Sequence, residues 1–521
     1  AAAAHRGRFS FPARSTAPHV DMVPLQASSL SDFIGGNEWT SLLVLLAAGS
    51  ILMSLSFWAN KVWAMKAFPG PMPLPFIGNS LDIGLAKSLI LYLKRMRSLH
   101  GGVFCIWLFN QPMVACMSPK TARQILADAK RVDKAAAYRR ILANFFGNGL
   151  VTSSGEAHKR DKACVGRYFT MTHVAKYIST IQKCVDDGIE RYCKRLEEQP
   201  GNVVQLFHVT TLRITGLLIG SYDYWQNPEL AELCAAEVSF ASTTIGEHMI
   251  SGIPMWSIFP KVRRVHRARD GLCGASLRDI PIQKRKDLIA NGTEDIPNDP
   301  LTAMMRDGLS EKLIGDQIMT LLCAGHDTTS YLLGYACYCL AQHQDVQAKV
   351  REEVARVVGN KDGIERNDLD QLHYMQQVIQ ETVRLYPVVP FVLRVTKEDV
   401  FLDETKQTIP AGTNLLIPLG HINRDPAIWE EPATFNPSRM AGVPMPSTKH
   451  GFFPFAYGER ICLGNVLAVV EAKMFLVRML QRYRITGDPN FRPKIRAGVS
   501  LVSDSIDVSL ERCPLPVAGL P

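Results

Sequence analysis

Residues 455–464 read FAYGERICLG and place Cys462 just before a long apolar helical pattern at residues 466–480. Because glycine has no Cβ, Gly458 and Gly464 let the backbone pass close to a flat, bulky group. Unpaired N–H groups at a helix start stabilise a thiolate, the form of cysteine that binds metals. Arg460 would offer a fixed cationic fork to carboxylates on the same group. By itself, Cys462 is either a buried structural cysteine at a strand-to-helix turn or a metal ligand.

The spacing of the whole stretch resembles the haem-binding signature of the cytochrome P450 superfamily. Phe455, Gly458, Arg460, Cys462 and Gly464 match its defined positions. The resemblance implies that these residues bind haem b and that the Cys462 thiolate is the axial ligand of the iron. It also implies a mainly α haem-thiolate fold with a small β-rich subdomain, of the membrane-anchored eukaryotic type.

A second pattern, at residues 310–342, predicts a helix long enough to cross a whole domain. Ala324, Gly325, Asp327 and Thr328 interrupt its apolar run. Glycine costs a helix about 1 kcal/mol relative to alanine, and Asp and Thr compete for backbone hydrogen bonds. The patch therefore indicates a function, although a structural helix with a tolerated polar patch is the alternative. The patch resembles the family's oxygen-binding helix: Ala324 and Gly325 would leave room beside the iron, Thr328 would hydrogen-bond oxygen or its water, and Asp327 would relay protons.

A helical pattern at residues 375–385 places Glu381 and Arg384 three residues apart on one face. Such a pair alone is usually a surface ion pair worth a few tenths of a kcal/mol. The resemblance instead implies a buried structural triad that Arg439 completes.

Two further positions bear on the carboxylates of a haem. By resemblance, Arg394 aligns with a residue that binds a haem propionate. His158 and Lys162 stand where the family usually carries a tryptophan and, four residues later, an arginine. Lys162 would meet a propionate as a point charge without a bidentate fork. The alternative for this segment is a solvated basic helix face.

The composition indicates a mildly basic globular protein, since 58 basic and 49 acidic residues give a net charge of +9 and 47% of the residues are apolar. This pattern predicts no nucleic-acid partner; it suits an acidic partner protein or a membrane surface. The twelve cysteines show no zinc or disulfide spacing. Because we find no glycine-rich flavin or nicotinamide motif, we expect NADPH electrons to arrive through a separate reductase, with a cytochrome b-type protein as a further donor. Arg160 and Lys162 are the predicted docking contacts.

The N-terminal part predicts a membrane anchor. Residues 1–40 indicate a disordered or targeting segment, and residues 41–59 form an uncharged run that as a helix would be about 28 Å long, enough to span a bilayer. A proline-rich hinge at 60–80 and the monooxygenase domain at 81–521 follow. Positive charge after the run predicts a single pass of the endoplasmic reticulum membrane with the domain in the cytosol; a plastid or mitochondrial membrane is the alternative.

The reaction that the resemblance implies is insertion of one atom of O₂ into a hydrophobic small molecule, such as a lipid, terpenoid or polyketide. Two alternatives are a haem-thiolate peroxide isomerase or dehydratase and a catalytically silent haem-binding protein. The residues that we expect around the substrate are mostly apolar: Phe145, Phe146, Phe240, Met319, Leu322, Val389, Phe391 and Leu501.

Overall fold

The computed structural model describes residues 38–86, 89–251 and 255–516. These residues divide into two units, one that ends at Asn60 and one that begins at Lys61. Most of the predicted segment 1–40 lies outside the described residues. Helix α2 (Glu38–Ala64) contains a stretch, Leu42–Ala64, with a mean hydropathy of 2.1, long and apolar enough to cross a membrane. This helix is a candidate membrane anchor that extends five residues beyond the predicted run.

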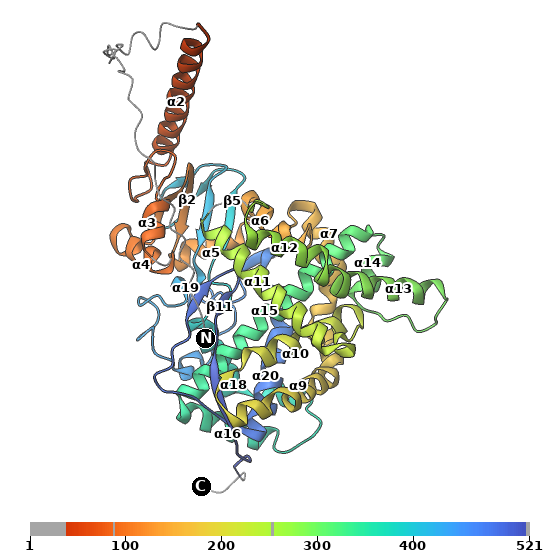
Figure 1. The fold of residues 1–521 in the computed structure, drawn as a ribbon. Helices are drawn as coiled ribbons and strands as arrows, with labels where there is room; N and C mark the ends of the chain where they lie inside the picture. The colour runs from red at the N-terminus through yellow and green to blue at the C-terminus, as the bar shows by residue number, and fades with distance from the viewer. Residues whose placement is uncertain (1–37, 87–88, 252–254, 517–521) are drawn as a thin grey trace, which may run out of the picture. The chain divides into compact units, whose positions relative to one another are not determined.

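The second unit is mainly helical (Figure 1). Its longer helices are α4 (Leu89–His100), α5 (Pro119–Ala127), α6 (Ala136–Phe146), α7 (Gly155–Gly166), α9 (Ile178–Glu198), α10 (Val204–Gly220), α11 (Pro228–Ser251), α12 (Pro260–Asp270), α13 (Ile280–Ala290), α15 (Glu311–Gln342), α16 (Gln344–Val357), α18 (His373–Leu385) and α20 (Asn465–Arg482). The shorter ones are α3 (Ser80–Leu85), α8 (Met171–Val174), α14 (Pro300–Arg306), α17 (Arg366–Gln371) and α19 (Leu419–Ile422). Short 3₁₀ or π turns are η1 (Arg167–Phe169), η2 (Ala175–Tyr177), η3 (Tyr224–Gln226), η4 (Gly274–Asp279), η5 (Pro437–Met440) and η6 (Gly458–Arg460).

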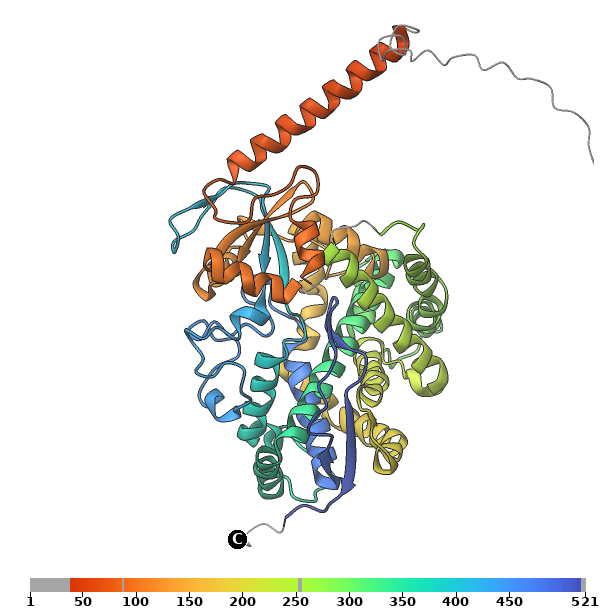
Figure 2. The same ribbon diagram turned by 60° about the vertical axis from the view of Figure 1, so that its left-hand side comes forward.

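The largest sheet has five strands in the order β1-β2-β8-β5-β3 and lies to one side of the helices (Figure 2). Its strands are β1 (Val103–Leu108), β2 (Gln111–Cys116), β3 (Val132–Asp133), β5 (Val392–Thr396) and β8 (Asn414–Ile417). Neighbouring strands are antiparallel except β2 and β8, which are parallel. The smaller sheets pair β4 (Gly201–Asn202) and β9 (Tyr483–Thr486) with β12 (Asp507–Arg512), β6 (Val400–Phe401) with β7 (Thr408–Ile409), and β10 (Ile495–Ala497) with β11 (Leu501–Ser503).

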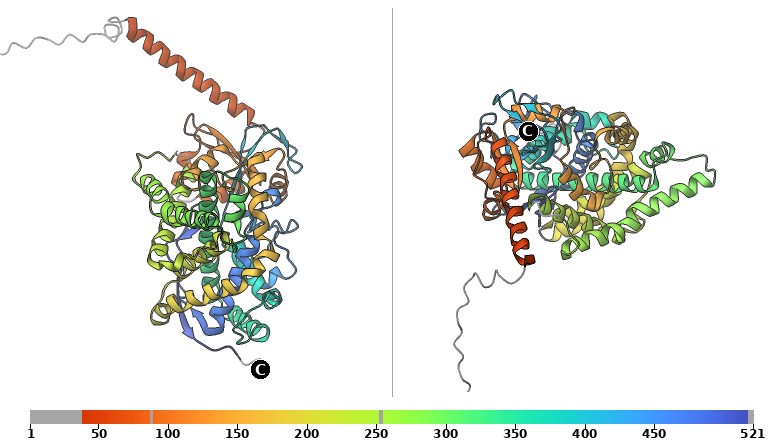
Figure 3. Two further views of the ribbon diagram at one scale, coloured as in Figure 1. Left: turned by 90° about the vertical axis from the view of Figure 1, so that its right-hand side faces the viewer. Right: turned by 90° about the horizontal axis from the view of Figure 1, so that it is seen from above.

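The long predicted helix is α15, which runs through the helical part of this unit (Figure 3). Its start is capped by Ser310, whose hydroxyl accepts a hydrogen bond from the Leu313 N–H at 3.4 Å. It packs along α10 and also contacts α18 and α20. Most of its residues are buried, which explains why its apolar pattern continues around the whole helix. The polar patch causes no break in the helix.

The proline-rich stretch 69–79 is held against β1. The Cys105 N–H donates to the Pro69 carbonyl at 2.8 Å, and the Asn79 N–H donates to the Trp107 carbonyl at 2.8 Å. The Asn79 side chain accepts from the Trp107 N–H at 2.9 Å. Strand β1 in turn pairs with β2, so this stretch covers the outer edge of the five-stranded sheet.

Candidate functional site

A cavity of about 290 Å³ lies between α15, α7, β5 and the segment that leads into α20. Ala324, Gly325 and Thr328 line it from α15, and Cys462 and Gly464 line it from the segment before α20. The sequence-predicted cysteine and the polar patch of the long helix therefore lie on walls of the same cavity.

Cys462 differs from the other eleven cysteines of the chain. It is exposed to the cavity, whereas ten of the others are buried and Cys513 is half-buried. Its N–H donates to the Phe455 carbonyl at 2.9 Å, which closes the loop before α20. Desolvation by the enclosing protein raises the pKa of the Cys462 thiol, and a hydrogen bond from the Gly464 backbone lowers it. A positive charge beside the sulfur, such as a metal cation in the cavity, would lower the pKa of the thiol and favour the thiolate.

The two glycines that flank Cys462 have different roles. A Cβ on Gly464 would meet no atom within 4 Å, so this residue leaves open space beside the cavity. Gly458 has φ +76, and a Cβ there would lie 2.3 Å from the Leu126 carbonyl oxygen. We expected Gly458 to face the bound group; the structure places it against α5 instead, because η6 approaches that helix closely.

The α15 wall of the cavity is open where Gly325 and Ala324 stand. The Thr328 hydroxyl donates to the Ala324 carbonyl at 2.6 Å and so stays within its own helix. A Cβ on Gly325 would lie 2.9 Å from the Thr215 hydroxyl oxygen, so this glycine lets α10 and α15 pack closely.

Asp327 does not line this cavity. Its Oδ2 accepts hydrogen bonds from Ser242 on α11, at 2.9 Å, and from Ser500 in the β10–β11 turn. Its Oδ1 is buried and has no hydrogen-bond partner among the described residues. Burial raises the pKa of Asp327 to about 6, and the hydrogen bonds from Ser500 and Ser242 oppose this shift. The carboxyl group therefore titrates closer to neutral pH than an ordinary aspartate, and it lies outside the cavity lining.

One end of the cavity gathers basic side chains: Lys134, His158, Lys162, Arg394 and Arg460. Arg460 forms an ion pair with Asp133 at 2.7 Å and donates to the Ser153 carbonyl at 3.1 Å. Arg394 is 6% exposed, and its hydrogen bond in the described structure goes to the Leu393 carbonyl at 3.0 Å. Desolvation and the neighbouring guanidinium of Arg460 lower the pKa of Arg394, with opposing effects of Tyr138 and Asp133.

Lys134 is the most strongly perturbed cation at this end. Burial and the positive charges of Arg460 and Arg394 lower its pKa well below the usual range. Its ammonium donates to the carbonyls of Leu150 and Val151. Like charges crowded into a buried site repel one another, so this end of the cavity fits an anionic ligand.

Lys162 reaches across to the segment before α20, where its ammonium donates to the Glu459 carbonyl at 2.6 Å. It lines the cavity as the alignment implied. Arg160, its predicted companion in partner docking, lies on the exposed face of α7 and pairs with Asp161 at 2.7 Å.

Glu381, Arg384 and Arg439 lie together beneath the site. Arg384 Nε and Nη2 donate to the two Glu381 oxygens at 2.7 and 2.8 Å, and both side chains are 0% exposed. Arg439 Nε donates to Glu381 at 3.1 Å. Arg384 also donates to the Pro432 carbonyl at 2.7 Å, so the triad fastens α18 to the chain around η5.

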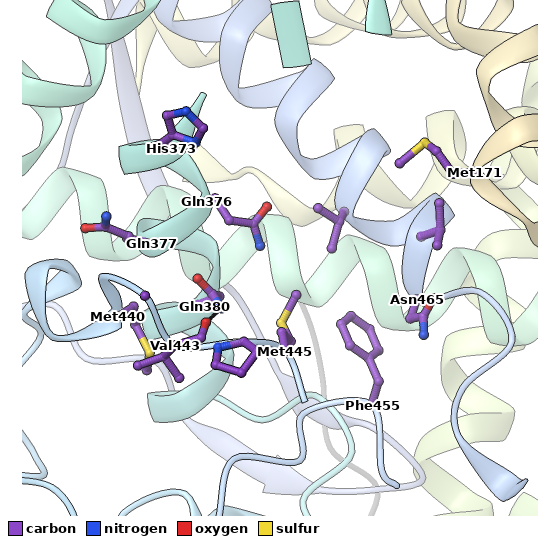
Figure 4. A pocket seen from close by; sticks show the side chains of 14 residues that line it. Met171, His373, Gln376, Gln377, Gln380, Met440, Val443, Met445, Phe455 and Asn465 are labelled. Atoms are coloured by element: carbon purple, nitrogen blue, oxygen red, sulfur yellow. Dashed lines mark hydrogen bonds between the residues drawn. The ribbon is translucent and has the colours of Figure 1, made fainter. Parts of the chain in front are cut away.

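A larger pocket of about 620 Å³ is shown in Figure 4, and Phe455 lines both this pocket and the smaller cavity. Amide side chains of α18 and the side chains of Met171 and Met445 surround it. It contains neither the accessible cysteine nor the basic cluster. We therefore assign the chemistry to the smaller cavity.

Comparison with known proteins identifies the family of the chain. The family model described as Cytochrome P450 matches residues 68–509. The chain belongs to the cytochrome P450 family. Cytochrome P450 734A1 of Arabidopsis thaliana is 26% identical over 81% of this chain and 81% of its own length. Cytochrome P450 4F12 of Homo sapiens is 26% identical over 86% and 91%, and a cytokinin hydroxylase of Arabidopsis thaliana is 25% identical over 83% and 89%.

Membership shows that this P450 is a haem-dependent monooxygenase, an oxidoreductase that receives electrons from a redox partner, with a cysteine thiolate as ligand of the haem iron. The cavity fits that cofactor. It has one accessible thiol, open space at Gly464, and a basic end that matches two propionates. Lys134 and Tyr138, which also line the basic end, escaped the sequence analysis because no local pattern distinguishes them.

The expected substrate contacts agree less well with the structure. Of the eight apolar residues, Val389 lines the cavity. Phe391 and Leu501 line a separate small cavity of about 80 Å³, and Phe240 lines another pocket. Phe145, Phe146, Met319 and Leu322 belong to the core. Apolar character alone could not separate cavity walls from core in such a large helical unit.

Proposed function

We propose that this P450 is a membrane-anchored monooxygenase that oxidises a hydrophobic small molecule, and that Cys462 is its iron ligand. The observation that carries the proposal is the cavity itself, because Cys462 is the cysteine that lines it and Thr328 lies on another wall. When bound, the haem supplies activation of O₂ with electrons from the redox partner.

The side chains around the cavity have different roles in the proposed function. Lys134, Arg394, Arg460 and Lys162 hold the propionates and give them an orientation. Gly464 donates its N–H to the ligand sulfur and so disperses its charge. Ala324 has a small side chain that leaves room at the α15 wall, and Gly325 lets α10 pack closely against α15. The apolar side chains of Leu321, Leu332, Val383 and Val389 exclude water and favour an apolar substrate.

Thr328 and Asp327 are the proposed proton donors of the site. Thr328 presents a hydroxyl at the cavity wall, and the residue before it, Asp327, has a pKa of about 6, so it can take up and release a proton near neutral pH. A group whose pKa lies close to the working pH is suited to proton transfer. Splitting O₂ so that one atom leaves as water consumes two protons, so this supply is required.

The proposed electron donor is an NADPH-dependent reductase at the surface of α7 near Arg160, with a cytochrome b-type protein as a further donor. Lys61 in the last turn of the candidate anchor and Lys66 just after it support a cytosolic orientation at the endoplasmic reticulum. The deciding experiment is reconstitution in vesicles with a reductase, NADPH and O₂, and a panel of hydrophobic compounds that shift the haem spectrum.

We expect the product to contain one labelled atom from ¹⁸O₂ and to form only when the reductase is present. Turnover of a hydroperoxide without reductase, and no labelled product, would instead identify a peroxide-rearranging enzyme. In the same assay Thr328→Ala is expected to raise hydrogen peroxide per NADPH several-fold while haem content stays unchanged. Unchanged coupling of NADPH to product would remove Thr328 from proton delivery.

A further inference from the structure

His158 on α7 is a buried imidazole that lines the cavity but has no protein partner for its ring. The residue is 9% exposed, and its backbone N–H bonds to the Ser154 carbonyl at 3.4 Å. Among the described residues no hydrogen bond reaches either ring nitrogen. Its ring nitrogens are not among the buried side-chain atoms that lack a partner in the described residues, so they are accessible and can bind a ligand in the cavity.

The charged groups that face His158 come from several elements. Lys162 lies one turn further along α7, and Arg460 is the last residue of η6. Asp133 ends β3, and Lys134 follows it. Arg394 on β5 and Tyr138 on α6 line the same end of the cavity, and Arg139 of α6 adds a positive charge near Lys134 and Arg460. Asp133 is the acid of this group, and it is already paired with Arg460.

In this surrounding the protein alone keeps His158 neutral. Desolvation and the charges of Arg460, Lys134 and Lys162 lower its pKa to about 3, against a smaller opposing effect of Asp133. Two carboxylates bound at the same end would offset those cations and move the pKa back toward its ordinary value near 6.5. The tryptophan that the family usually carries here can donate a hydrogen bond but cannot titrate.

We propose that His158 makes the reduction of this P450 proton-coupled: the site takes up one electron from the redox partner and His158 takes up one proton from solvent. The proposal rests on the proposed function, since it needs the haem bound with its propionates beside α7. An added negative charge nearby favours the protonated imidazole, so the pKa of His158 is higher in the reduced protein than in the oxidised one. By linkage, the midpoint potential must then rise as the pH falls between those two pKa values.

The test is the midpoint potential of the haem-loaded protein between pH 5.5 and 9, measured by spectroelectrochemistry without substrate or reductase. The wild type is expected to show a midpoint potential that falls as the pH rises within part of this range, with a slope of at most about 59 mV per pH unit. His158→Trp and His158→Gln keep an N–H donor and remove the titration, so both should flatten the slope. His173→Gln, at a histidine that does not line the cavity, should leave it unchanged.

A flat wild-type profile would overturn the proposal, as would a slope that survives in both His158 variants. A slope that disappears in Lys134→Met but persists in His158→Gln would also overturn it, because Lys134 would then be the coupled group. These failures differ from a failure of the proposed function. Before each titration the reduced carbonyl spectrum shows whether the haem is bound through a thiolate, and its absence would contradict the proposed function itself.

Discussion

Asp327 shows how a single residue of the site depends on partners that are distant in the chain. Its carboxylate is turned away from the cavity because Ser242 and Ser500 offer hydroxyl donors on the other side of α15. The second oxygen is left without a partner, and desolvation outweighs the two hydrogen bonds. Asp327 can therefore take up and release a proton near pH 6, and its ionised form lowers the stability of the folded state.

The folded-state pKa of about 6 lies above the ordinary value of 3.8, so Asp327 stabilises the protein below about pH 3.8 and loses that contribution as the pH rises through 6. Asp327→Asn should remove this loss of stability at higher pH, because the asparagine side chain does not ionise. We expect urea unfolding to show similar stability for variant and wild type near pH 4. At pH 7.5 the variant should be more stable by up to about 3 kcal/mol. A difference that does not change with pH would contradict the assigned burial.

At the residue scale, sequence reasoning succeeded where the chemistry is local. The glycine frame of Cys462 and the alanine, glycine and threonine of α15 are adjacent in the chain, and all but Gly458 line the cavity. The side chain of Asp327 points away from the cavity because of the packing of α11 and the β10–β11 turn. Lys134 lines the cavity because of the position of β3. No pattern of a single segment contains that information.

At the scale of elements, the segment before α20 is positioned by η6 against α5. Gly458 makes this possible, because its positive φ and the nearby Leu126 carbonyl leave no room for a side chain. Arg460, two residues later, then reaches Asp133 and the Ser153 carbonyl. The contact with α5 therefore determines where Cys462 lies.

Gly458→Ala should destabilise the protein and lower its haem content, since it combines backbone strain with overlap at 2.3 Å. Gly442→Ala is the matched control: this glycine has φ +70, but a Cβ there would meet no atom within 4 Å. Left-handed backbone at an alanine costs about 1–2 kcal/mol. We expect thermal unfolding to show about that loss for Gly442→Ala and a clearly larger one for Gly458→Ala. Equal losses would mean that the η6–α5 contact does not matter.

The long helices were predictable, because burial imposes a strong periodic or continuous apolar pattern on them; residues 310–342 and 466–480 correspond to α15 and α20. Strands β1 and β2 contain largely buried runs of six residues. The two-residue strands β3, β4, β6 and β7 could not be predicted, since so short a segment has no period. Their pairing follows from the fold around them.

At the scale of the whole molecule, the site collects residues from position 134 to position 468 onto one cavity, and a candidate membrane anchor precedes this unit in the chain. The sequence motifs indicated the walls, and the tertiary fold brought them together. At the basic end of the cavity, His158 and Lys162 replace the usual tryptophan and arginine. Lys134 adds a further basic side chain there. The proposed function depends on one bond, from the Cys462 sulfur to the haem iron.

The most direct test of that bond is the carbonyl spectrum of the reduced protein, compared between wild type, Cys462→Ser and Cys513→Ser. Cys513 is a half-buried cysteine outside the cavity and serves as the matched control. We predict that wild type and Cys513→Ser show the band position of a thiolate-bound haem and that Cys462→Ser loses it. A thiolate-type band in Cys462→Ser would contradict the account.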